Sequence, residues 1–393
     1  MTIEAPFIGL SRDLVVSPGS TAVQLDATLR LATTAISFKG IRVKSEHPIS
    51  VHVLDIASTY DGGFLVLPND LLGSQYVAVT SAGVKSQLVI SSAIDRNDVT
   101  VTIRGNNNVT HRGIVYRNGD AITETLDTFQ TWQIESDGDL TGTTITAKGR
   151  IAVISSNLCS YIPETSTTCD FTVEQLLPSN AWGRTFVVPF VSLCLNKLRV
   201  MLRDDATQVR VVYDNQIWTA TLNSSNHIDR DFLPTPSTPQ YAVVEADKPV
   251  SVNLFTGSIM NLQGHCAPSM TSIPATLQYL DSYQIHVPFP NITFLHLSLI
   301  VPSGKQNTIS IKFINNNPVS VLPSTYGEIV QTDHGQYVVI HVNATVPAAG
   351  GLMVTSSEHA SFGAILYAAT GNGSLSTPLG LAVELLQGIV YYV

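Results

Sequence analysis

Paired acidic side chains are the residues of this chain whose types and spacing could do chemistry. Four pairs stand close together in the sequence: Asp95/Asp98, Asp137/Asp139, Asp204/Asp205 and Asp229/Asp231. Clustered carboxylates could hold Ca²⁺, because hard cations prefer oxygen ligands, and glycosidases work with two carboxylates. Each pair falls in a turn-like segment, and Asp also favours turns through its own backbone hydrogen bonds. We therefore expect structural turns, with SDGDLTG at 136–142 as the best calcium candidate.

Histidine side chains could bind a metal ion, and tryptophan side chains could stack on sugar rings. The ten histidines are dispersed, and His52, His286 and His341, which alternate within strand-like segments, are expected to be strand residues rather than ligands. The indoles of Trp132, Trp182 and Trp218 could line a carbohydrate platform, but core packing is the favoured use. The chain has no Gly-x-Ser-x-Gly elbow, no His-Glu-x-x-His and no phosphate-binding Gly-rich loop. We predict no catalytic residue, no metal, no cofactor and no enzyme activity.

The four cysteines, Cys159, Cys169, Cys194 and Cys266, are even in number and contain no Cys-x-x-Cys, which favours two disulfides over a zinc or redox motif. Cys159 and Cys169 bracket a short turn-rich loop, so we expect them to pair. Cys194 with Cys266 then follows by elimination, although four cysteines allow three connectivities. Disulfides persist in oxidising compartments, so the chain is expected to be extracellular.

The composition limits the classes of partner that we expect for this chain. Charged residues make up 13% of the chain, about half the usual share, and the net charge is −9. This predicts no nucleic-acid partner. No apolar run reaches the roughly 20 residues of a membrane span. The segment that begins at Met1 does not resemble a signal peptide, so we expect a removed signal or an excised domain. Five sequons, no more than chance would give, are candidate glycosylation sites: Asn108, Asn223, Asn291, Asn343 and Asn372.

The elements that must position these residues are β-strands. Short segments rich in Val, Ile, Thr and aromatic residues, with period-2 alternation, recur between Gly, Asn, Asp and Pro. The clearest hairpin is VRVVYDNQIWTATL: Val209, Val211 and Tyr213 alternate before an Asp214-Asn215 turn, and Ile217, Thr219 and Thr221 alternate after it. The fold class is therefore predicted to be all-β.

Three motif series show that the chain is internally repeated. Hairpin-like strands begin at Val99, Val209 and Ile309. Val- or Ile-rich runs recur around Val51, Val153, Val252 and, more loosely, Gly363. Pro-led turns before an extended run recur at Pro68, Pro178 and Pro274. The repeat length of about 100 to 110 residues holds about eight short strands, or two four-stranded units.

Two architectures fit such units. One is a propeller-like ring of about seven four-stranded sheets, slightly favoured because the C-terminal LAVELLQGIVYYV could close it, and the other is a row of tandem β-sandwiches. We expect one repeat-built body over residues 1–393. Its approximate parts are a half repeat at 1–58, repeats at 59–160, 161–260 and 261–370, and a closing or edge strand at 371–393.

The stretch from Gly149 to Pro189 resembles the signature of the IgGFc-binding protein N-terminal domain family. It combines Cys159, Cys169 and Asp170 with Glu174-Gln175-Leu176, Pro178 and Trp182-Gly183. A second family-like stretch begins at Ala267, where members usually have Asp. The resemblance covers about residues 30 to 370.

The resemblance implies an extracellular protein-interaction or adhesion module, associated with mucus or a secreted matrix, whose partner is an extracellular protein or glycoprotein. Immunoglobulin Fc is a candidate partner because some members bind it, but the signature encodes no binding residue. A carbohydrate- or mucin-binding lectin-like module and a self-associating structural subunit are the alternatives. Glycan binding would separate the first alternative from a protein partner, and filament formation would support the second.

Overall fold

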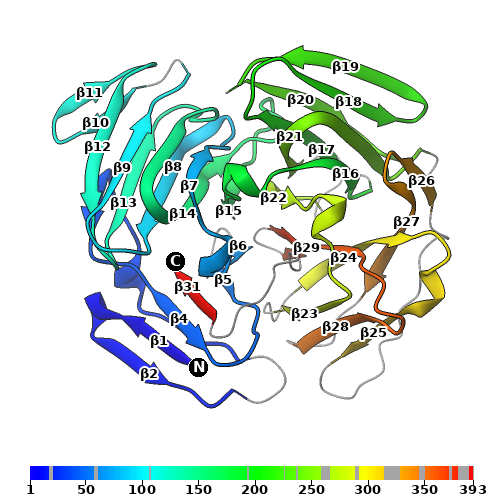
Figure 1. The fold of residues 1–393 in the computed structure, drawn as a ribbon, viewed down its shortest axis with the longest axis horizontal. Coiled ribbons are helices and arrows are strands. Elements are labelled where there is room, and N and C mark those ends of the chain that lie inside the picture. Colours follow the sequence, from blue (N-terminus) through cyan, green and yellow to red (C-terminus); the bar gives the residue numbers. More distant parts are fainter. Residues whose placement is uncertain are drawn as a thin grey trace.

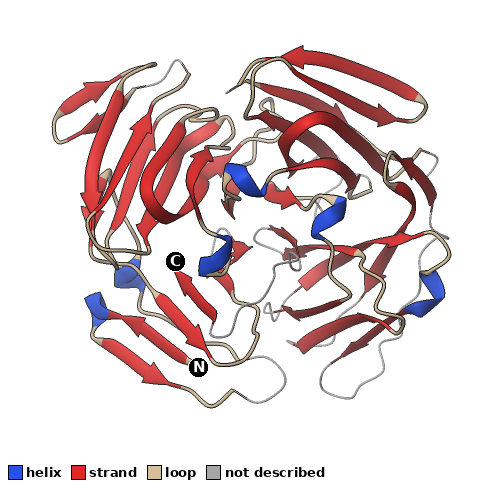
Figure 2. Cartoon of the chain, in the orientation of Figure 1, coloured by secondary structure: helices blue, strands red, loops and turns tan. Residues whose placement is uncertain are grey.

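The computed structural model describes residues 1–16, 21–56, 61–105, 108–192, 194–224, 226–235, 238–257, 266–287, 292–313, 328–344, 350–370, 374–378 and 389–392. The regular structure in these residues is β-strand, interrupted only by short 3-10 helices (Figure 2). Every strand pair of the described sheets is antiparallel, which confirms the predicted all-β class. No helix in the described part of the chain is long and apolar enough to cross a membrane.

The first sheet joins the two ends of the chain (Figure 1). Its strands, in spatial order, are β2 (Leu10–Asp13), β1 (Thr2–Ala5), β4 (Arg42–Ser45) and β31 (Ile389–Tyr392). The helices η1 (Pro6–Ile8) and η2 (Ala27–Leu29) lie within the same N-terminal segment. β31 pairs with β4 so that Tyr391 lies opposite Val43. The C-terminal strand therefore completes a sheet that the N-terminal strands begin.

An eight-stranded sheet follows, preceded by the two-stranded sheet of β5 (His52–Ile56) and β6 (Asp61–Leu65). Its strands are β3 (Ala35–Ser37), β7 (Gly73–Val77), β8 (Gly83–Ser92), β9 (Asn97–Thr102), β12 (Ala121–Leu126), β13 (Thr131–Ser136), β14 (Thr144–Ser160) and β15 (Asp170–Gln175). The helix η3 (Asn69–Leu71) precedes β7, and the hairpin of β10 (Val109–His111) and β11 (Ile114–Tyr116) stands beside the sheet.

A seven-stranded sheet repeats the same arrangement. Its strands are β16 (Gly183–Pro189), β17 (Leu195–Leu202), β18 (Thr207–Tyr213), β19 (Gln216–Leu222), β20 (His227–Phe232), β21 (Tyr241–Gly257) and β22 (Ser269–Ile273), with η4 (Ser179–Ala181) before β16. The hairpin of β18 and β19 turns at Asp214 and Asn215, as predicted. Both turn residues have positive φ, 47° and 61°, which is the geometry of a two-residue hairpin turn that matches the twist of the strands.

The last described sheets have three and five strands. The first contains β23 (Ser282–Val287), β28 (Gly350–Ser356) and β25 (Ile309–Phe313); the second contains β26 (Glu328–Thr332), β27 (Gly335–Ala344), β24 (Ile292–Pro302), β29 (Gly363–Thr370) and β30 (Ser374–Pro378). The helices η5 (Thr276–Gln278) and η6 (Gln306–Thr308) precede β23 and β25.

One long strand serves two groups of strands in each of the two larger sheets. Thr144–Ala147 of β14 pairs with β9, and Thr144–Thr146 and Ile151 pair with β7, whereas the part from Ile151 onward pairs with β8 and then also with β15. β21 does the same with β16 and β18, then with β17 and β22. In the last part of the chain, β28 and β29 divide this role between them. The sequence predicts two separate four-stranded units in each repeat. In each of these two sheets, one continuous strand instead joins the two groups of strands.

The second motif series marks equivalent strands in space. The segments around Val51, Val153, Val252 and Gly363 form β5, the later part of β14, the later part of β21, and β29. Each pairs with the short strand that follows it, namely β6, β15, β22 and β30. These four short strands contact one another in a closed order, β6 to β15 to β22 to β30 and back to β6. Figure 1 shows β6, β15 and β22 near the centre of the molecule.

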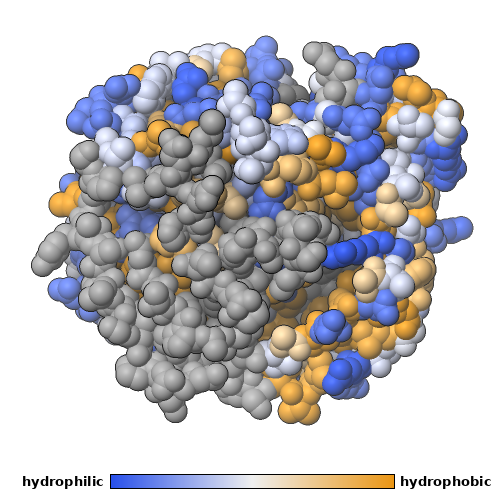
Figure 3. Space-filling view, turned by 180° about the vertical axis from the view of Figure 1, so that it is seen from behind, coloured by the Kyte–Doolittle hydropathy of each residue, from blue (hydrophilic) through white to orange (hydrophobic). Residues whose placement is uncertain are grey.

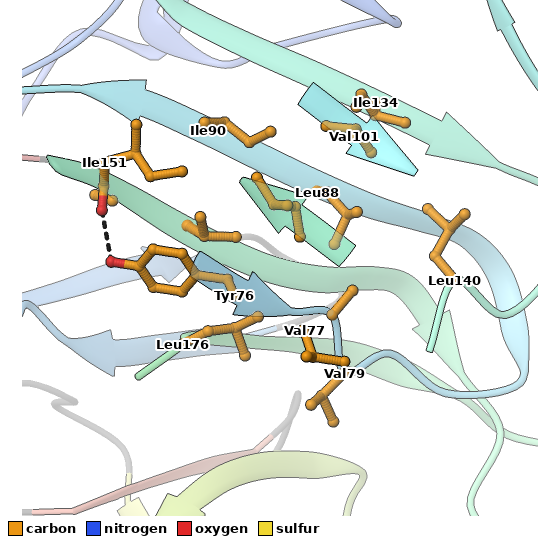
Figure 4. Packing of buried hydrophobic residues seen from close by; sticks show 14 of the residues in the cluster. Tyr76, Val77, Val79, Leu88, Ile90, Val101, Ile134, Leu140, Ile151 and Leu176 are labelled. Carbon is orange, nitrogen blue, oxygen red and sulfur yellow. Dashed lines mark hydrogen bonds between the residues drawn. The ribbon is translucent and has the colours of Figure 1, made fainter. Parts of the chain in front are cut away.

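The core consists of apolar side chains that alternate along these strands. Around β8 and β14 the cluster includes Leu88, Ile90, Ile134 and Ile151, all fully buried (Figure 4). In the same view the Tyr76 hydroxyl donates a hydrogen bond of 2.6 Å to the carbonyl of Ile151. This bond satisfies a buried carbonyl where the pairing of β14 changes from β7 to the strands that follow. The seven-stranded and five-stranded sheets carry clusters of their own.

Trp182 belongs to the core and follows the Pro-led turn. Pro178 precedes η4, and Trp182 directly precedes β16. The indole is 8% exposed, packs in the cluster around β14, and donates its N–H to the carbonyl of Leu177 at 3.2 Å. The equivalent turns after Pro68 and Pro274 also contain a 3-10 helix before the next strand. The third motif is therefore a Pro-led helical turn that connects a central strand to the next sheet.

We expect Trp182→Ala to lower the free energy of unfolding by about 3–5 kcal/mol, because it leaves a cavity in the core. Trp218 is a matched control, because its indole is only partly buried where it packs against its cluster. Trp218→Ala should cost clearly less. Urea unfolding of both variants checks this expectation, and an equal loss for the two would show that Trp182 is not a core anchor.

Candidate binding site

The acidic pairs do not form a shared site. Asp95 and Asp205 each accept hydrogen bonds in turns, from Thr128 and Ser224. Asp204 pairs with Arg203, and Asp137 pairs with Lys85 in a largely exposed position. The expectation that every pair lies in a turn is wrong for Asp98, in β9, and for Asp229 and Asp231, in β20. Among the described residues no group of three or more His, Cys, Asp or Glu side chains is placed to hold a metal ion.

Asp139 and Asp229 instead flank a buried arginine. Arg199 of β17 is 6% exposed and makes a two-pronged contact with Asp229, Nε to Oδ1 at 2.8 Å and Nη2 to Oδ2 at 2.6 Å. Asp229 lies in β20, and the pairing of β17 with β20 places it directly opposite Arg199. Nη1 of Arg199 donates to the Thr80 carbonyl and the Thr141 hydroxyl, and stands 3.5 Å from Asp139. The guanidinium thus joins the seven-stranded sheet to the loops of the eight-stranded sheet.

The charge of Arg199 changes the protonation of its partners. Burial by itself would raise the pKa of Asp139 and Asp229, but the nearby guanidinium and its hydrogen bonds hold both pKa values below the usual range. All three groups are therefore ionised at neutral pH. A satisfied ion cluster of this kind is a structural clamp, because its lone pairs are already used by protein donors.

A second buried acid lies between central strands. Glu174 of β15 is 2% exposed, and its carboxyl accepts backbone N–H groups from Gln175 at 3.1 Å and from Ser272 of β22 at 3.0 Å. Burial raises the pKa of Glu174 to about 8 despite these donors. The contact links the eight-stranded and seven-stranded sheets at the centre of the molecule. Sequence reasoning recorded Glu174 as part of a family signature without assigning it a role.

The histidines expected in strands do lie in strands. His52 is in β5 and His341 is in β27, whereas the side chain of His286, in β23, lies outside the described residues. His341 stacks on His296, with ring centroids 5.0 Å apart, and both contact Ser298. Burial first, and then the neighbouring His296, lowers the pKa of His341 to about 3. His341 is therefore uncharged at neutral pH, and the two stacked rings belong to the interior of the five-stranded sheet.

All three tryptophans pack against hydrophobic clusters. Trp132 is fully buried, Trp182 is nearly so, and Trp218 packs at the border of the cluster around Phe232. The three indoles belong to different strands or turns and form no common platform in the described structure. Their positions agree with the core packing favoured above.

The cysteines form two disulfides. Cys159 of β14 is bonded to Cys169, the residue before β15, and Cys194 before β17 is bonded to Cys266 before β22. The second bond is buried beside Val191 and Tyr367. Among the sequons, Asn108 and Asn223 are exposed, the side chain of Asn343 in β27 lies outside the described residues, and Asn291 and Asn372 lie outside them altogether. Both disulfides support the strands that run into the centre of the molecule.

Exposed apolar side chains alone do not locate a binding surface. Hydrophobic residues occur among hydrophilic ones on the described reverse face of the molecule (Figure 3). Scattered apolar exposure is normal for a soluble protein, so a hollow with convergent polar groups is the stronger signal.

Such a hollow opens between the seven-stranded and five-stranded sheets. This cleft of about 550 Å³ is lined on one side by β18 and β21, including Arg210, Tyr241 and Glu245, and on the other by Ile329–Asp333 of β26 and its turn. Arg210 pairs with Glu245 at 2.6 Å, and Glu245 accepts the backbone N–H of Asp333 at 2.9 Å. Sequence reasoning missed the cleft because its walls are about 90 residues apart in the chain. A smaller and more apolar hollow, about 200 Å³, lies beside Phe64 and Phe171.

Comparison with known proteins gives the chain a family. The fold and disulfides define an all-β, disulfide-linked protein whose sheets repeat along the chain. The family model described as IgGFc binding protein matches residues 62–368, and the chain belongs to this family. It is 30% identical over 283 residues to the human IgGFc-binding protein. That alignment covers 70% of this chain but only 5% of the relative. No solved structure matches the chain.

We expect Arg199→Met to destabilise the protein by about 3–5 kcal/mol, because Asp139 and Asp229 would lose the guanidinium that lies between them in a mostly buried site. Arg112→Met is the matched control: Arg112 also pairs with an acid, Glu124, but is 67% exposed, so about 1 kcal/mol or less should be lost. Thermal or urea unfolding at pH 7 measures both. A loss for Arg199→Met as small as that of Arg112→Met would contradict the clamp.

Glu174 predicts a loss of stability toward alkaline pH. Its folded pKa of about 8 lies above the usual glutamate pKa of 4.5, so its contribution to stability is complete below pH 4.5 and is lost as pH rises through 8. The loss is on the order of 4 kcal/mol for a shift of this size. Glu174→Gln should remove that slope, whereas Glu358→Gln, at an exposed ion pair, should keep it. Urea unfolding between pH 4.5 and 9 checks the slopes, and identical slopes for wild type and Glu174→Gln would refute the assignment.

Proposed function

We propose that this chain is an extracellular, non-catalytic protein-interaction or adhesion module. The observation that carries the proposal is the family match over residues 62–368. The two disulfides support an oxidising location, because such bonds persist outside the cytosol. The ionisable clusters around Arg199 and Glu174 are used by contacts between sheets, which favours a scaffold over a catalytic centre for these groups.

The proposal includes a ring-like body of about seven four-stranded units, with repeats near 59–160, 161–260 and 261–370. The half repeat at 1–58 and the closing strand at 371–393 complete it. Pairing of β31 with β4 supports closure, and so does the closed order of contacts among β6, β15, β22 and β30. A ring offers binding surfaces at the loops and edges of its sheets while the central strands stay packed.

The proposed partner is an extracellular protein or glycoprotein, as in mucus or a secreted matrix. The name of the human relative refers to binding the Fc part of immunoglobulin G, and Fc is therefore a specific candidate for this chain. Because the chain corresponds to 5% of that relative, the binding activity of the whole protein is a hypothesis here. N-glycans at the exposed Asn108 and Asn223 are part of the same proposal.

The test is binding of the purified, disulfide-bonded chain to immobilised Fc and to a secreted mucin, each with and without its glycans, measured by biolayer interferometry. We expect binding to at least one protein to persist within about threefold after the glycans are removed. Binding that disappears with the glycans would favour the lectin-like alternative, and concentration-dependent filaments without any partner would favour a self-associating subunit. The reduced chain is the control for folding.

A further inference from the structure

The cleft between the seven-stranded and five-stranded sheets has a closed floor and an open mouth. At the floor, Val243 of β21 and Val330 of β26 belong to one buried cluster. Toward the mouth, Val212 of β18 lines the wall and lies beside Ile217 of β19 across the hairpin. Ile217 is 56% exposed, and Ile329 on the opposite side is 66% exposed. Ile329 therefore gives the lining an exposed apolar side chain, and Ile217 provides a second one next to the lining residue Val212.

One wall is an edge strand. β26 pairs with β27 on one side and has no second strand beside it among the described residues. The β26–β27 hairpin closes with Thr332 opposite Gly335. In an antiparallel pair every second residue bonds to the partner strand, so the backbone groups of Thr332 and Val330 face β27. By this alternation, the backbone groups of Ile329 and Gln331 point to the free edge. The Tyr241 hydroxyl, from the opposite wall, donates to the Ile329 carbonyl at 3.4 Å, which shows that this edge faces the cleft.

The lining has an excess of acidic groups. Arg210 is the basic side chain of the lining, and Glu245 pairs with it. Asp214 and Asp333 then remain at the lining without a basic counterpart among the described lining residues. Asp214 follows β18 and Asp333 follows β26, so each wall supplies one carboxyl. A ligand that brings a positive charge is therefore favoured over one that brings a negative charge.

We infer that this cleft binds an extended segment of a partner protein, which adds as a strand to the free edge of β26 and places a basic side chain beside Asp214 and Asp333. The inference rests on the proposed function and names a surface for it. Main-chain hydrogen bonds to Gln331 and to the N–H of Ile329 supply affinity, and alternate side chains contact Ile217, Val212 and Ile329. Among the described residues no strand pairs with the outer edge of β26, and an unpaired edge is an aggregation hazard that a bound strand would cover.

The probe is a library of fluorescent seven-residue peptides with Arg fixed at the centre and β-branched or aromatic residues varied elsewhere. Matched peptides carry Glu at the centre, and others carry Pro at two adjacent positions. We expect Arg peptides to bind the whole disulfide-bonded chain at least tenfold more tightly than both, with affinity that falls as salt rises. Hydrogen exchange should slow in residues 328–333 when the peptide is bound. The absence of binding by Arg peptides, or equal binding by Glu peptides, overturns the inference.

Three variants locate the site. Asp214→Asn combined with Asp333→Asn changes only exposed side chains and should abolish the preference for Arg over Glu. Ile329→Arg should weaken Arg peptides at least tenfold, whereas Ile114→Arg, on the distant edge hairpin of β10 and β11 and 56% exposed, should leave them unchanged. Thermal unfolding confirms that each variant is folded. Unchanged peptide binding by both the Asp variant and Ile329→Arg would show that the cleft is not the site.

The same variants separate this inference from the proposed function. If wild type binds Fc or mucin and Ile329→Arg binds them equally well, the chain is an interaction module whose contact surface lies elsewhere. If wild type binds neither protein but binds Arg peptides at the cleft, the strand-binding inference stands and the proposed partners are wrong. Loss of both activities in Ile329→Arg, with Ile114→Arg unaffected, supports the two together.

Discussion

Each of the two larger sheets depends on one long strand, β14 or β21, that pairs with two groups of strands. β14 pairs with β7 and β9 in its first part, changes register between Thr146 and Ile151, and then pairs with β8 and β15. A change of register leaves backbone groups without hydrogen-bond partners in the sheet. The buried Tyr76 hydroxyl donates a hydrogen bond to one such group, the Ile151 carbonyl. Tyr283 donates in the same way to the Phe362 carbonyl before β29. The relative orientation of neighbouring sheets is thereby set within one continuous backbone.

Buried polar groups then determine how successive sheets meet. Apolar clusters exclude water but are tolerant of small shifts, whereas Arg199 and Glu174 require named partners at hydrogen-bond distance. Arg199 reaches from β17 to Thr80 and Thr141, and Glu174 reaches from β15 to Ser272. A misplaced neighbour would leave the buried charge of Arg199 unpaired, which costs several kcal/mol, or the buried carboxyl of Glu174 without its backbone donors. The low content of charged residues is consistent with this use, because several of the few charges specify the packing.

Local sequence carried much of the fold but little of the candidate site. The Asp214-Asn215 turn was predictable because two-residue hairpin turns demand residues that tolerate positive φ. The Val- and Ile-rich runs were predictable because buried strands have a strong pattern, and they identify β5, β14, β21 and β29. Asp229 was misassigned to a turn because its role depends on Arg199 in the neighbouring strand. The only local sign of a buried ion pair was an arginine inside the apolar run of β17, and the sequence did not indicate which acid pairs with it.

The cleft lies beside an added outer strand of the five-stranded sheet. β13 and β20 pair with β8 and β17, and β27 pairs with β24 in the same way. The eight-stranded sheet adds β3 on the outer side of β13, and the five-stranded sheet adds β26, which forms a hairpin with β27, on the outer side of β27. Strand β26 faces β18 and β21 across the cleft, and among the described residues no further strand pairs with its outer edge. Repeated strands are constrained by the core on both sides, so an added edge strand is where a scaffold of this kind can acquire a binding surface without disturbing its packing.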